Sequence, residues 1–341
     1  MNAPSPLASQ TSAAVGAARR WRPAPLIAGA AALHAGAAAA LLAQPSTWPW
    51  AAGGVVASHL ALTAAGLWPK SALLGPNWTR LPEMREVESE STSGLRDADG
   101  GTDRRIALTI DDGPDPEVTP RVLDLLDQYG ARATFFCVGD LARRHPRCIE
   151  AIVARGHAVE NHSQRHRHTF SLSGPGALRR EIDTAQRTLT EIAGMCPLFF
   201  RAPAGLRNPF LEPVLCGLGL QLASWTRRGF DTRERDARKV AQGLLHGLAP
   251  RDILLVHDGH AARGSNGQPV VLEALPEVLR AAASAQLRWT TLREALNPAL
   301  NPATAPAAAD GARLARQTDG TRPPAGLPGR NGAGHSPFDK I

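Results

Sequence analysis

Residues 105–114 read Arg105-Ile-Ala-Leu-Thr-Ile-Asp-Asp-Gly-Pro114. A mostly apolar run followed by Asp-Asp-Gly-Pro predicts a buried strand that ends abruptly and projects Asp111 and Asp112 from its C-terminal end. Neighbouring carboxylates repel each other, so the pair is costly unless a cation lies between them or each acid has its own partner. One acid could therefore bind a metal while the other acts as a general base, provided that histidines arrive from elsewhere in the chain.

The composition indicates one folded domain with non-globular flanks. Alanine dominates both ends of the 341-residue chain, so the hydrophobic fraction of 43% overstates the core. The net charge of +7 comes from arginines without a basic and aromatic stripe, so we expect a solvated basic surface and no nucleic-acid partner. The cysteines have no CxxC or zinc-finger spacing, which favours buried thiols and leaves a disulfide open; they are Cys137, Cys148, Cys196 and Cys216.

Composition also divides the chain into segments. Residues 1–23 are rich in Ala, Ser and Pro and end in a basic cluster, and residues 24–69 hold two apolar stretches. Residues 70–104 are expected to be a linker, since from residue 82 onward they are polar and lack apolar periodicity. Residues 105–297 form the predicted folded domain. Residues 298–341 are rich in Ala, Pro, Gly and Arg and are predicted to be disordered.

The two apolar stretches, at about 25–43 and 48–68, are each close to the length that spans a bilayer. Trp48, Trp50 and Trp68 lie where an interfacial aromatic belt is expected. We predict a two-helix membrane hairpin; a cleaved signal peptide ending after the first stretch and an Ala-rich soluble helical pair are the alternatives. Positive charges before and after the hairpin place both of its ends in the cytoplasm, with the folded domain on the inner face of the membrane. The signal-peptide alternative makes that domain periplasmic or secreted.

The folded domain alternates strand-like and helix-like segments. Short apolar runs between amphipathic stretches indicate parallel strands joined by helical crossovers, whose polar residues gather at the C-terminal ends of the strands. The expected strands are 106–110, 133–138, 157–160, 198–201, 221–225 and 253–257. The expected helices are 119–129, 147–155, 177–192, 236–247 and 271–284.

A second motif, His162-Ser-Gln-Arg-His166, follows the third expected strand. Two histidines at i and i+4 of a helical turn present their imidazoles on the same side, the spacing used to chelate one ion. With Asp112 they make a two-histidine, one-carboxylate set that leaves positions open for water and substrate. A histidine pair alone would more often be a surface pair, and the acidic pair upstream is what favours a metal site.

Polar residues also follow the later expected strands. Arg201 begins Arg201-Ala-Pro-Ala-Gly205; its guanidinium can brace a carboxylate bidentately, and the turn can expose a backbone N–H toward an oxyanion. His257 ends an apolar strand, and a histidine kept basic by a carboxylate such as Asp231 suits a general acid. Taken one at a time, these residues have ordinary explanations. Arg201 would then be a surface arginine, Asp231 a helix cap and His257 a core histidine.

Together and in this order, these elements resemble the polysaccharide deacetylase family, also called the NodB homology domain or carbohydrate esterase family 4. The resemblance covers roughly residues 105–297. It implies a distorted, incomplete (β/α) barrel, preceded here by the predicted two-helix membrane segment. It also implies a hydrolase that removes an N-acetyl or other N-acyl group from an amino-sugar glycan, with no obligate protein partner.

The resemblance assigns roles to the catalytic residues. Asp111 would be the base, with Arg201 orienting it. His257 would be the acid, paired with Asp231. The backbone N–H of Ala204 would contribute to the oxyanion hole.

The resemblance also implies a divalent metal ion, commonly zinc, bound by Asp112, His162 and His166. Three positions depart from the family pattern: Ile110 stands where Phe is usual, Ala204 where a large residue is usual, and Thr232 where Trp is usual. These departures open the predicted groove and bear on the choice of glycan more than on the chemistry. The alternatives are a deformylase or deacetylase of a lipid-linked sugar at the inner membrane face, and a catalytically inactive glycan-binding module.

Overall fold

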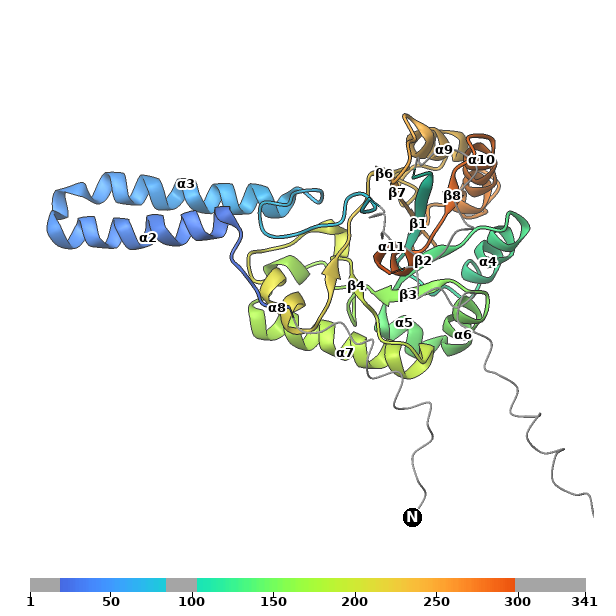
Figure 1. Cartoon of the computed structure of the whole chain (residues 1–341), viewed down its shortest axis with the longest axis horizontal. Helices are drawn as coiled ribbons and strands as arrows, with labels where there is room; N and C mark the ends of the chain where they lie inside the picture. The colour runs from blue at the N-terminus through green and yellow to red at the C-terminus, as the bar shows by residue number, and fades with distance from the viewer. Residues whose placement is uncertain (1–18, 84–102, 298–341) are drawn as a thin grey trace, which may run out of the picture. The chain divides into compact units, whose positions relative to one another are not determined.

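The computed structural model describes residues 19–83 and 103–297, and residues 105–297 form a curled parallel sheet covered by helices (Figure 1). The sheet order is β5-β4-β3-β2-β1-β7-β6, with β8 beside β1, and every pairing between these strands is parallel. Among the described strands no pairing joins β5 to β6, so the sheet curls without closing, as an incomplete barrel does. The strands are β1 (Arg105–Asp111), β2 (Ala133–Cys137), β3 (Ala158–Asn161), β4 (Phe199–Phe200), β5 (Gln221–Leu222), β6 (Arg227–Arg228), β7 (Ile253–His257) and β8 (Arg288–Trp289).

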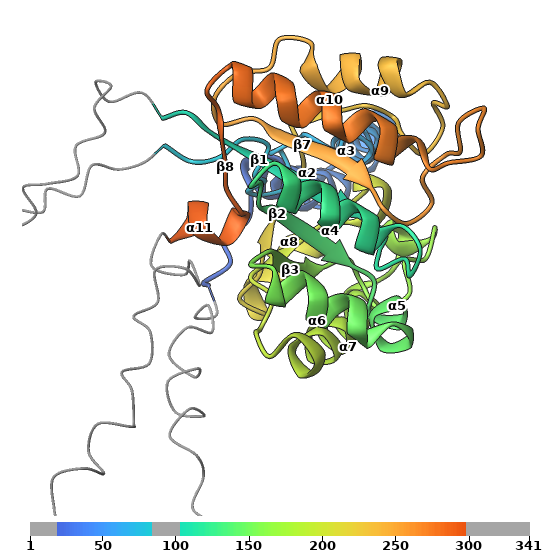
Figure 2. The same cartoon turned by 90° about the vertical axis from the view of Figure 1, so that its right-hand side faces the viewer.

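Helices connect successive strands except β5 and β6, which follow each other directly, and Figure 2 shows α4 and α10 lying over β1, β2 and β7. The helices of the domain are α4 (Thr119–Gln128), α5 (Gly139–Arg144), α6 (Pro146–Ala154), α7 (Pro175–Ala193), α8 (Leu211–Gly217), α9 (Ala237–Leu245), α10 (Val270–Ser284) and α11 (Leu292–Leu296). The expected alternation of strands and helices is confirmed. The sequence patterns missed α5, α8, β6, β8 and α11, because elements of two to seven residues are too short for a periodicity to be visible.

The two faces of β1 explain where its acidic end points. Leu108 and Ile110 belong to the core under the helices, whereas Ala107 packs in a second cluster on the inner side of the curl. Since side chains alternate along a strand, Asp111 shares the inner face with Ala107. All four cysteines are free, and the expectation of buried thiols holds for Cys137 and Cys216, whereas Cys148 and Cys196 are partly exposed.

Residues 69–83, most of which we expected to belong to a linker, instead pack on the domain. Trp78 forms a parallel bridge with Ala223, and its backbone N–H donates to Leu222. Leu74 and Leu81 are buried, at 1% and 0% exposure. The apolar residues of this segment are spaced irregularly, which is why no periodicity revealed them. The remainder of the expected linker from residue 84 to 102, most of segment 1–23 and the tail 298–341 lie outside the described residues.

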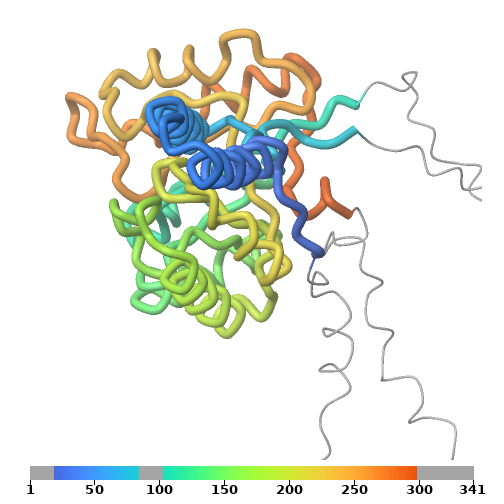
Figure 3. The backbone as a smooth tube through the Cα atoms, turned by 90° about the vertical axis from the view of Figure 1, so that its left-hand side faces the viewer, coloured from blue at the N-terminus to red at the C-terminus, as the bar shows by residue number. Residues whose placement is uncertain are grey.

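The N-terminal apolar stretches form α2 (Pro25–Ala43) and α3 (Trp48–Leu67), which lie side by side (Figures 1 and 3). Their mean hydropathies are 1.9 and 1.3, and neither contains an acidic residue, lysine or arginine. Large apolar side chains face outward, with Leu42 at 87% and Trp50 at 85% exposure. Both helices are long and apolar enough to cross a membrane, although a signal sequence meets the same criterion.

Candidate active site

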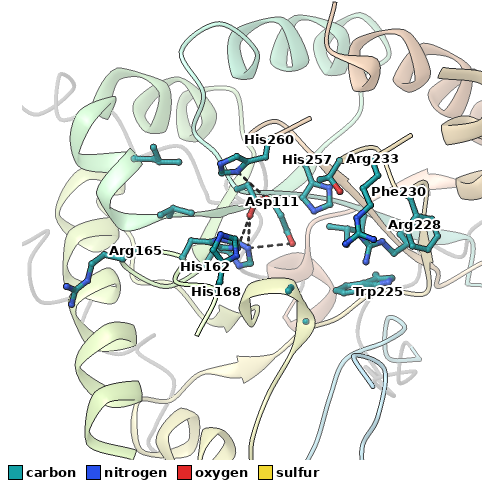
Figure 4. Close-up of a pocket in the computed structure, with 18 of the residues that line it drawn as sticks. Asp111, His162, Arg165, His168, Trp225, Arg228, Phe230, Arg233, His257 and His260 are labelled. Atoms are coloured by element: carbon teal, nitrogen blue, oxygen red, sulfur yellow. Dashed lines mark hydrogen bonds and ion pairs between the residues drawn. The ribbon is translucent and has the colours of Figure 1, made fainter. Parts of the chain in front are cut away.

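A cavity of about 910 Å³ opens at the C-terminal ends of the strands (Figure 4). Six of the eight predicted site residues line it: Asp111, Asp112, His162, His166, Ala204 and His257. The other two, Arg201 and Asp231, are buried directly behind it, at 1% and 0% exposure. The structure therefore brings together every residue that the sequence motifs singled out, because parallel strands deliver their C-terminal ends to one edge of the sheet.

Asp112, His162 and His166 form a compact cluster whose ligand atoms all lie within 4.8 Å of one another. The Nε2 atoms of His162 and His166 are each 3.1 Å from Asp112 Oδ1. Asp112 adopts a left-handed backbone conformation (φ 71°), which is uncommon for a residue other than glycine.

The histidine motif does not form the helical turn that its spacing predicts. Residues 162–166 are a loop, and Ser163 and His166 have positive φ of 67° and 50°. The loop is held by hydrogen bonds from Ser163 N–H to Asn161 Oδ1 (2.9 Å) and from His166 N–H to Ser163 Oγ (3.0 Å). The two imidazoles converge through this loop conformation. A positive φ at a non-glycine residue is costly, so the conformation persists only because its surroundings hold it.

The cluster fits a divalent metal by two tests. Four tetrahedral ligands about 2.1 Å from zinc are separated from one another by roughly 3.4 Å, which is close to the spacing of the carboxylate and imidazole atoms here. His162 Nδ1 lies 2.9 Å from the Arg201 carbonyl oxygen, so Nδ1–H donates there and leaves Nε2 as the ligand atom. The side chains that would hold the ion are Asp112, His162 and His166.

The titration of these groups is strongly coupled. Burial opposes the charge on Asp112, but hydrogen bonds from His162 and His260 hold the pKa of that carboxyl far below its usual value. Burial acts against protonation of His162, but the charges of Asp111 and Asp112 raise its pKa overall. Burial and the charge of His162 lower the pKa of His166 to about 4, so this imidazole is neutral at pH 7, the form that binds metals.

Asp111 is held from behind by Arg201. Arg201 Nη1 donates to Asp111 Oδ1 at 2.7 Å and to Thr109 Oγ1 at 2.8 Å, while its Nε and Nη2 donate to the carbonyls of Ala223 and Ser224. The contact is thus single, where the sequence suggested a bidentate one, because the remaining N–H groups anchor the guanidinium to the chain before β6. Asp111 Oδ2 lies 3.9 Å from His162 Nε2 and faces the cluster.

His257 and Asp231 form a buried pair on the other side of the cavity. His257 Nδ1 lies 2.9 Å from Asp231 Oδ1, and the His257 backbone N–H donates to Asp231 Oδ2 at 2.6 Å. Burial opposes the charged imidazole, but the hydrogen bond and charge of Asp231 prevail and raise the pKa of His257 to about 9. The imidazole is therefore protonated at pH 7 and can give up a proton.

Comparison with known proteins places this site in a family. The family model described as polysaccharide deacetylase matches residues 98–223. A peptidoglycan-N-acetylglucosamine deacetylase of Bacillus cereus is 32% identical over 193 residues, which are 56% of this chain and 87% of that protein. The chain belongs to the polysaccharide deacetylase family. A second deacetylase, the chitooligosaccharide deacetylase of a Bradyrhizobium species, is 33% identical over 158 residues, covering 46% of this chain and 72% of that protein.

Solved structures agree with the fold of a polysaccharide deacetylase. The family 4 carbohydrate esterase of Streptomyces lividans, in complex with acetate, matches with a TM-score of 0.50 and 29% identity over 55% of this chain and 93% of that one. A family 4 acetyl xylan esterase of Clostridium thermocellum, in complex with cobalt, matches with a TM-score of 0.50 and 29% identity over 56% and 89%. The predicted family, incomplete barrel and hydrolase class are confirmed.

The departures from the polysaccharide deacetylase pattern leave one wall of the cavity open. Ala204 is exposed, with φ of 55°, and lines the cavity without a large side chain. Thr232 lines it where the family has an indole. Trp225 ends an expected strand, and no sequence motif assigned it a role in the site. It is 4% exposed and supplies an aromatic surface on this side of the cavity.

Other residues of this polysaccharide deacetylase site were missed by the sequence motifs. His260 has φ of 59°, and its Nδ1 lies 3.6 Å from Asp112 Oδ2. Its place three residues after His257 was the available signal. Several basic and aromatic side chains also line the cavity, including Arg144, Arg165, Arg228, Phe230 and Arg233. Scattered arginines carry no spacing signal, so only the fold reveals that they share a cavity.

Proposed function

We propose that this chain hydrolyses the N-acetyl, or another N-acyl, group of an amino-sugar glycan, with Asp111 as base and His257 as acid. The observation that carries the proposal is the register of β1 and β7, in which Asp111 and His257 are paired. Paired residues on neighbouring strands lie about 5 Å apart at their backbones, so an acid and a base face the same small volume. Amide hydrolysis needs both: a base to activate water and an acid to protonate the departing amine.

A divalent ion fits the cluster of Asp112, His162 and His166. When bound there, such an ion would supply Lewis acidity and lower the pKa of bound water toward about 7. We propose zinc, on the basis of the nitrogen-rich ligand set.

The residues of the chain divide the proton transfers between them. Asp111 Oδ2 faces the cluster and takes the proton of the attacking water, while Arg201 fixes the carboxylate through Oδ1. The Ala204 N–H lines the cavity on a rigid turn after β4 and donates to the developing oxyanion. His257, oriented by the contact of its Nδ1 with Asp231, donates the proton of its Nε2 to the departing sugar nitrogen.

The relatives suggest the substrate class. The deacetylases named above act on peptidoglycan N-acetylglucosamine and on chitooligosaccharides. We therefore propose β-linked N-acetylglucosamine polymers as the first substrates to test, with acetylated xylan as the ester control because one structural relative is an acetyl xylan esterase.

A second candidate, a deacylase of a lipid-linked sugar at the membrane, is favoured by one observation. The chain at and just after the end of α3 contacts residues close to the cavity lining: Arg207 N–H donates to Gly66 O at 3.1 Å, and Ser224 Oγ, next to the lining residue Trp225, donates to Pro69 O at 2.7 Å. Lys70 Nζ donates to Thr226 O at 2.6 Å. If α2 and α3 span the inner membrane with both ends in the cytoplasm, the cavity lies close to its inner surface.

The test compares two neighbouring carboxylates in the full chain in detergent. Asp111→Asn should keep its metal and lose about 10²–10⁴ in acetate release from chitooligosaccharide, because the base is gone and the ligand set is intact. Asp112→Asn should lose both the metal and the activity. Metal content is measured by plasma mass spectrometry and acetate by an enzyme-coupled assay.

Asp124→Asn on the outer surface of α4 is the matched control, since it makes the same chemical change at an exposed carboxylate. It should keep both metal and rate. Near wild-type turnover in Asp111→Asn would overturn the assignment of the base. Absence of turnover in the metal-loaded wild type on every glycan would favour the inactive binding module.

A further inference from the structure

One wall of the cavity carries arginines that the proposed mechanism does not use. Arg228 ends β6, and Arg233 lies in the loop between β6 and α9. Both line the cavity beside Trp225 and Phe230, on the His257 side and across from His162 (Figure 4).

The Arg228 guanidinium is oriented but lacks an anionic partner. Its Cζ lies 4.5 Å from the centroid of the Phe230 ring and 5.3 Å from that of Trp225, so aromatic faces fix the position of the group. Its Nε is buried and has no hydrogen-bond partner among the described residues. Within the described part of the chain the guanidinium thus lacks an acceptor, and an oxyanion in the cavity that Arg228 lines would accept from its terminal N–H groups.

The charges of the cavity leave these two arginines uncompensated. The carboxylates nearby are engaged: Asp111 with Arg201, and Asp231 with His257. On the opposite wall, Arg165 is paired with Glu181 at 3.2 Å. By contrast, no carboxylate in the part of the chain that the structure describes lies within 4.0 Å of the guanidinium of Arg228 or Arg233.

The loop that bears Arg233 is tied to the proposed acid. Asp231 lies between the two arginines in sequence and binds both the backbone and the ring of His257. The backbone N–H of Arg233 donates to Phe230 O at 2.9 Å, and Ala262 N–H donates to Asp231 O at 2.8 Å. The arginines are therefore held beside the group that protonates the departing nitrogen.

We propose that Arg228 and Arg233 form a subsite for a phosphate group, so that the substrate is an N-acyl amino sugar carrying a glycosyl phosphate. This inference rests on the proposed function and names its substrate class. In a 2-acylamino sugar the anomeric carbon is bonded to the carbon that carries the nitrogen. An anomeric phosphate would therefore lie a few bonds from the nitrogen that His257 protonates, on the wall where the two guanidinium groups stand.

Guanidinium groups suit phosphate because their planar N–H forks match its oxygens. The phosphate could belong to a water-soluble sugar phosphate or to a lipid-linked sugar. The contacts of Pro69 and Lys70, just after α3, with Ser224 and Thr226 on either side of the lining residue Trp225 favour the lipid-linked form.

The test measures N-deacetylation by the full, metal-loaded chain in detergent on three substrates: chitotetraose bearing N-acetyl groups, N-acetylglucosamine 1-phosphate, and a polyprenyl-phosphate-linked N-acetylglucosamine. Arg233→Gln, at an exposed position, should raise KM for both phosphorylated substrates by about 10-fold or more, the effect of losing one charge-assisted contact, with kcat little changed. KM for the neutral oligosaccharide should stay within about twofold, because that substrate makes no such contact.

Arg235→Gln is the matched control, since it removes the same charge from the same loop at a residue that does not line the cavity. Arg228→Lys serves as the second variant, because it keeps the positive charge and removes the planar guanidinium with its paired N–H donors. Equal KM effects on neutral and phosphorylated substrates, or an equal effect of Arg235→Gln, would overturn the subsite. A wild-type preference for the polyprenyl-linked substrate over the soluble sugar phosphate identifies the lipid source, and the reverse preference identifies the soluble one.

Direct binding separates the two proposals. N-acetylglucosamine 1-phosphate, titrated calorimetrically, should bind the wild type at least about 10-fold more tightly than N-acetylglucosamine, and Arg233→Gln should remove the difference. If no substrate is deacetylated while this difference is present, the proposed function fails and the subsite stands. If deacetylation of the neutral oligosaccharide proceeds and no difference is found, the subsite fails alone.

Discussion

Replacing Asp231 with Asn should move the alkaline limit of activity to lower pH. The pKa of His257 is raised from its ordinary value of 6.5 to about 9, which corresponds to roughly 3 kcal/mol in favour of the charged ring. Asp231 supplies most of this through its hydrogen bond at 2.9 Å and its charge, against the opposing effect of burial. Without that charge the pKa should fall by roughly 2, since burial then acts with less opposition.

The assay is kcat/KM for acetate release measured from about pH 5 to pH 11, in which the essential acid appears as the alkaline limb. The wild type should lose activity as pH rises through about 9, because the acid must be protonated. Asp231→Asn should lose activity as pH rises through about 7, with its metal content unchanged. Glu234→Gln, at a partly exposed carboxylate of the same loop that does not contact His257, should leave the alkaline limb in place.

An alkaline limb that stays near 9 in Asp231→Asn would refute the pairing of Asp231 with the acid. Stability gives an independent readout of the same group. Because the pKa of His257 is raised in the folded state, its contribution to stability is complete below pH 6.5 and is lost as pH rises through about 9. Urea unfolding of the wild type should show this loss, and Asp231→Asn should show little of it.

Three further outcomes are expected. Arg293→Met should cost about 3–5 kcal/mol of unfolding free energy in urea, since Glu160 is 0% exposed and its ion pair with Arg293 at 2.7 Å would be broken. An equal effect of Arg293→Lys would contradict the role of the planar guanidinium group. Chelation should abolish turnover and lower the melting temperature, zinc should restore both, and in His166→Ala zinc should restore neither fully. Paired reporters active only inside or only outside the cell, fused after Asn297, should give an inside signal; an outside signal would favour a signal peptide and exported glycans.

Much of the fold was predictable because its central strands are strongly apolar. Residues 253–257 form β7 with the predicted bounds, and β1 ends at the acidic pair, because a buried parallel strand reads as a continuous apolar run. The site followed from the same fact, since residues at the C-terminal ends of such strands meet. Arg201 follows a predicted strand and could be expected near Asp111 for this reason, whereas the pairing of Asp231 with His257 was implied by the family resemblance, because β6 was not predicted.

The remainder depends on contacts that no local pattern encodes. His166 reaches the cluster through a left-handed loop conformation in place of the expected helical turn, and the spacing of two histidines cannot distinguish the two. Leu81 is buried against the domain although its neighbours in sequence are polar. Arg228 reaches the cavity from the end of β6, a strand of two residues that is too short to predict, and His260 reaches it from the loop after β7.

The central claim is that water, activated by Asp111, cleaves an N-acyl bond of an amino sugar. The most direct measurement is mass spectrometry of the products after incubation of the metal-loaded full chain with N-acetylated chitooligosaccharide in ¹⁸O-labelled water. The account predicts that each free amine formed is matched by one acetate carrying one ¹⁸O atom, and that Asp111→Asn suppresses both products together. Unlabelled acetate, or labelled acetate formed at the same rate by Asp111→Asn, would contradict it.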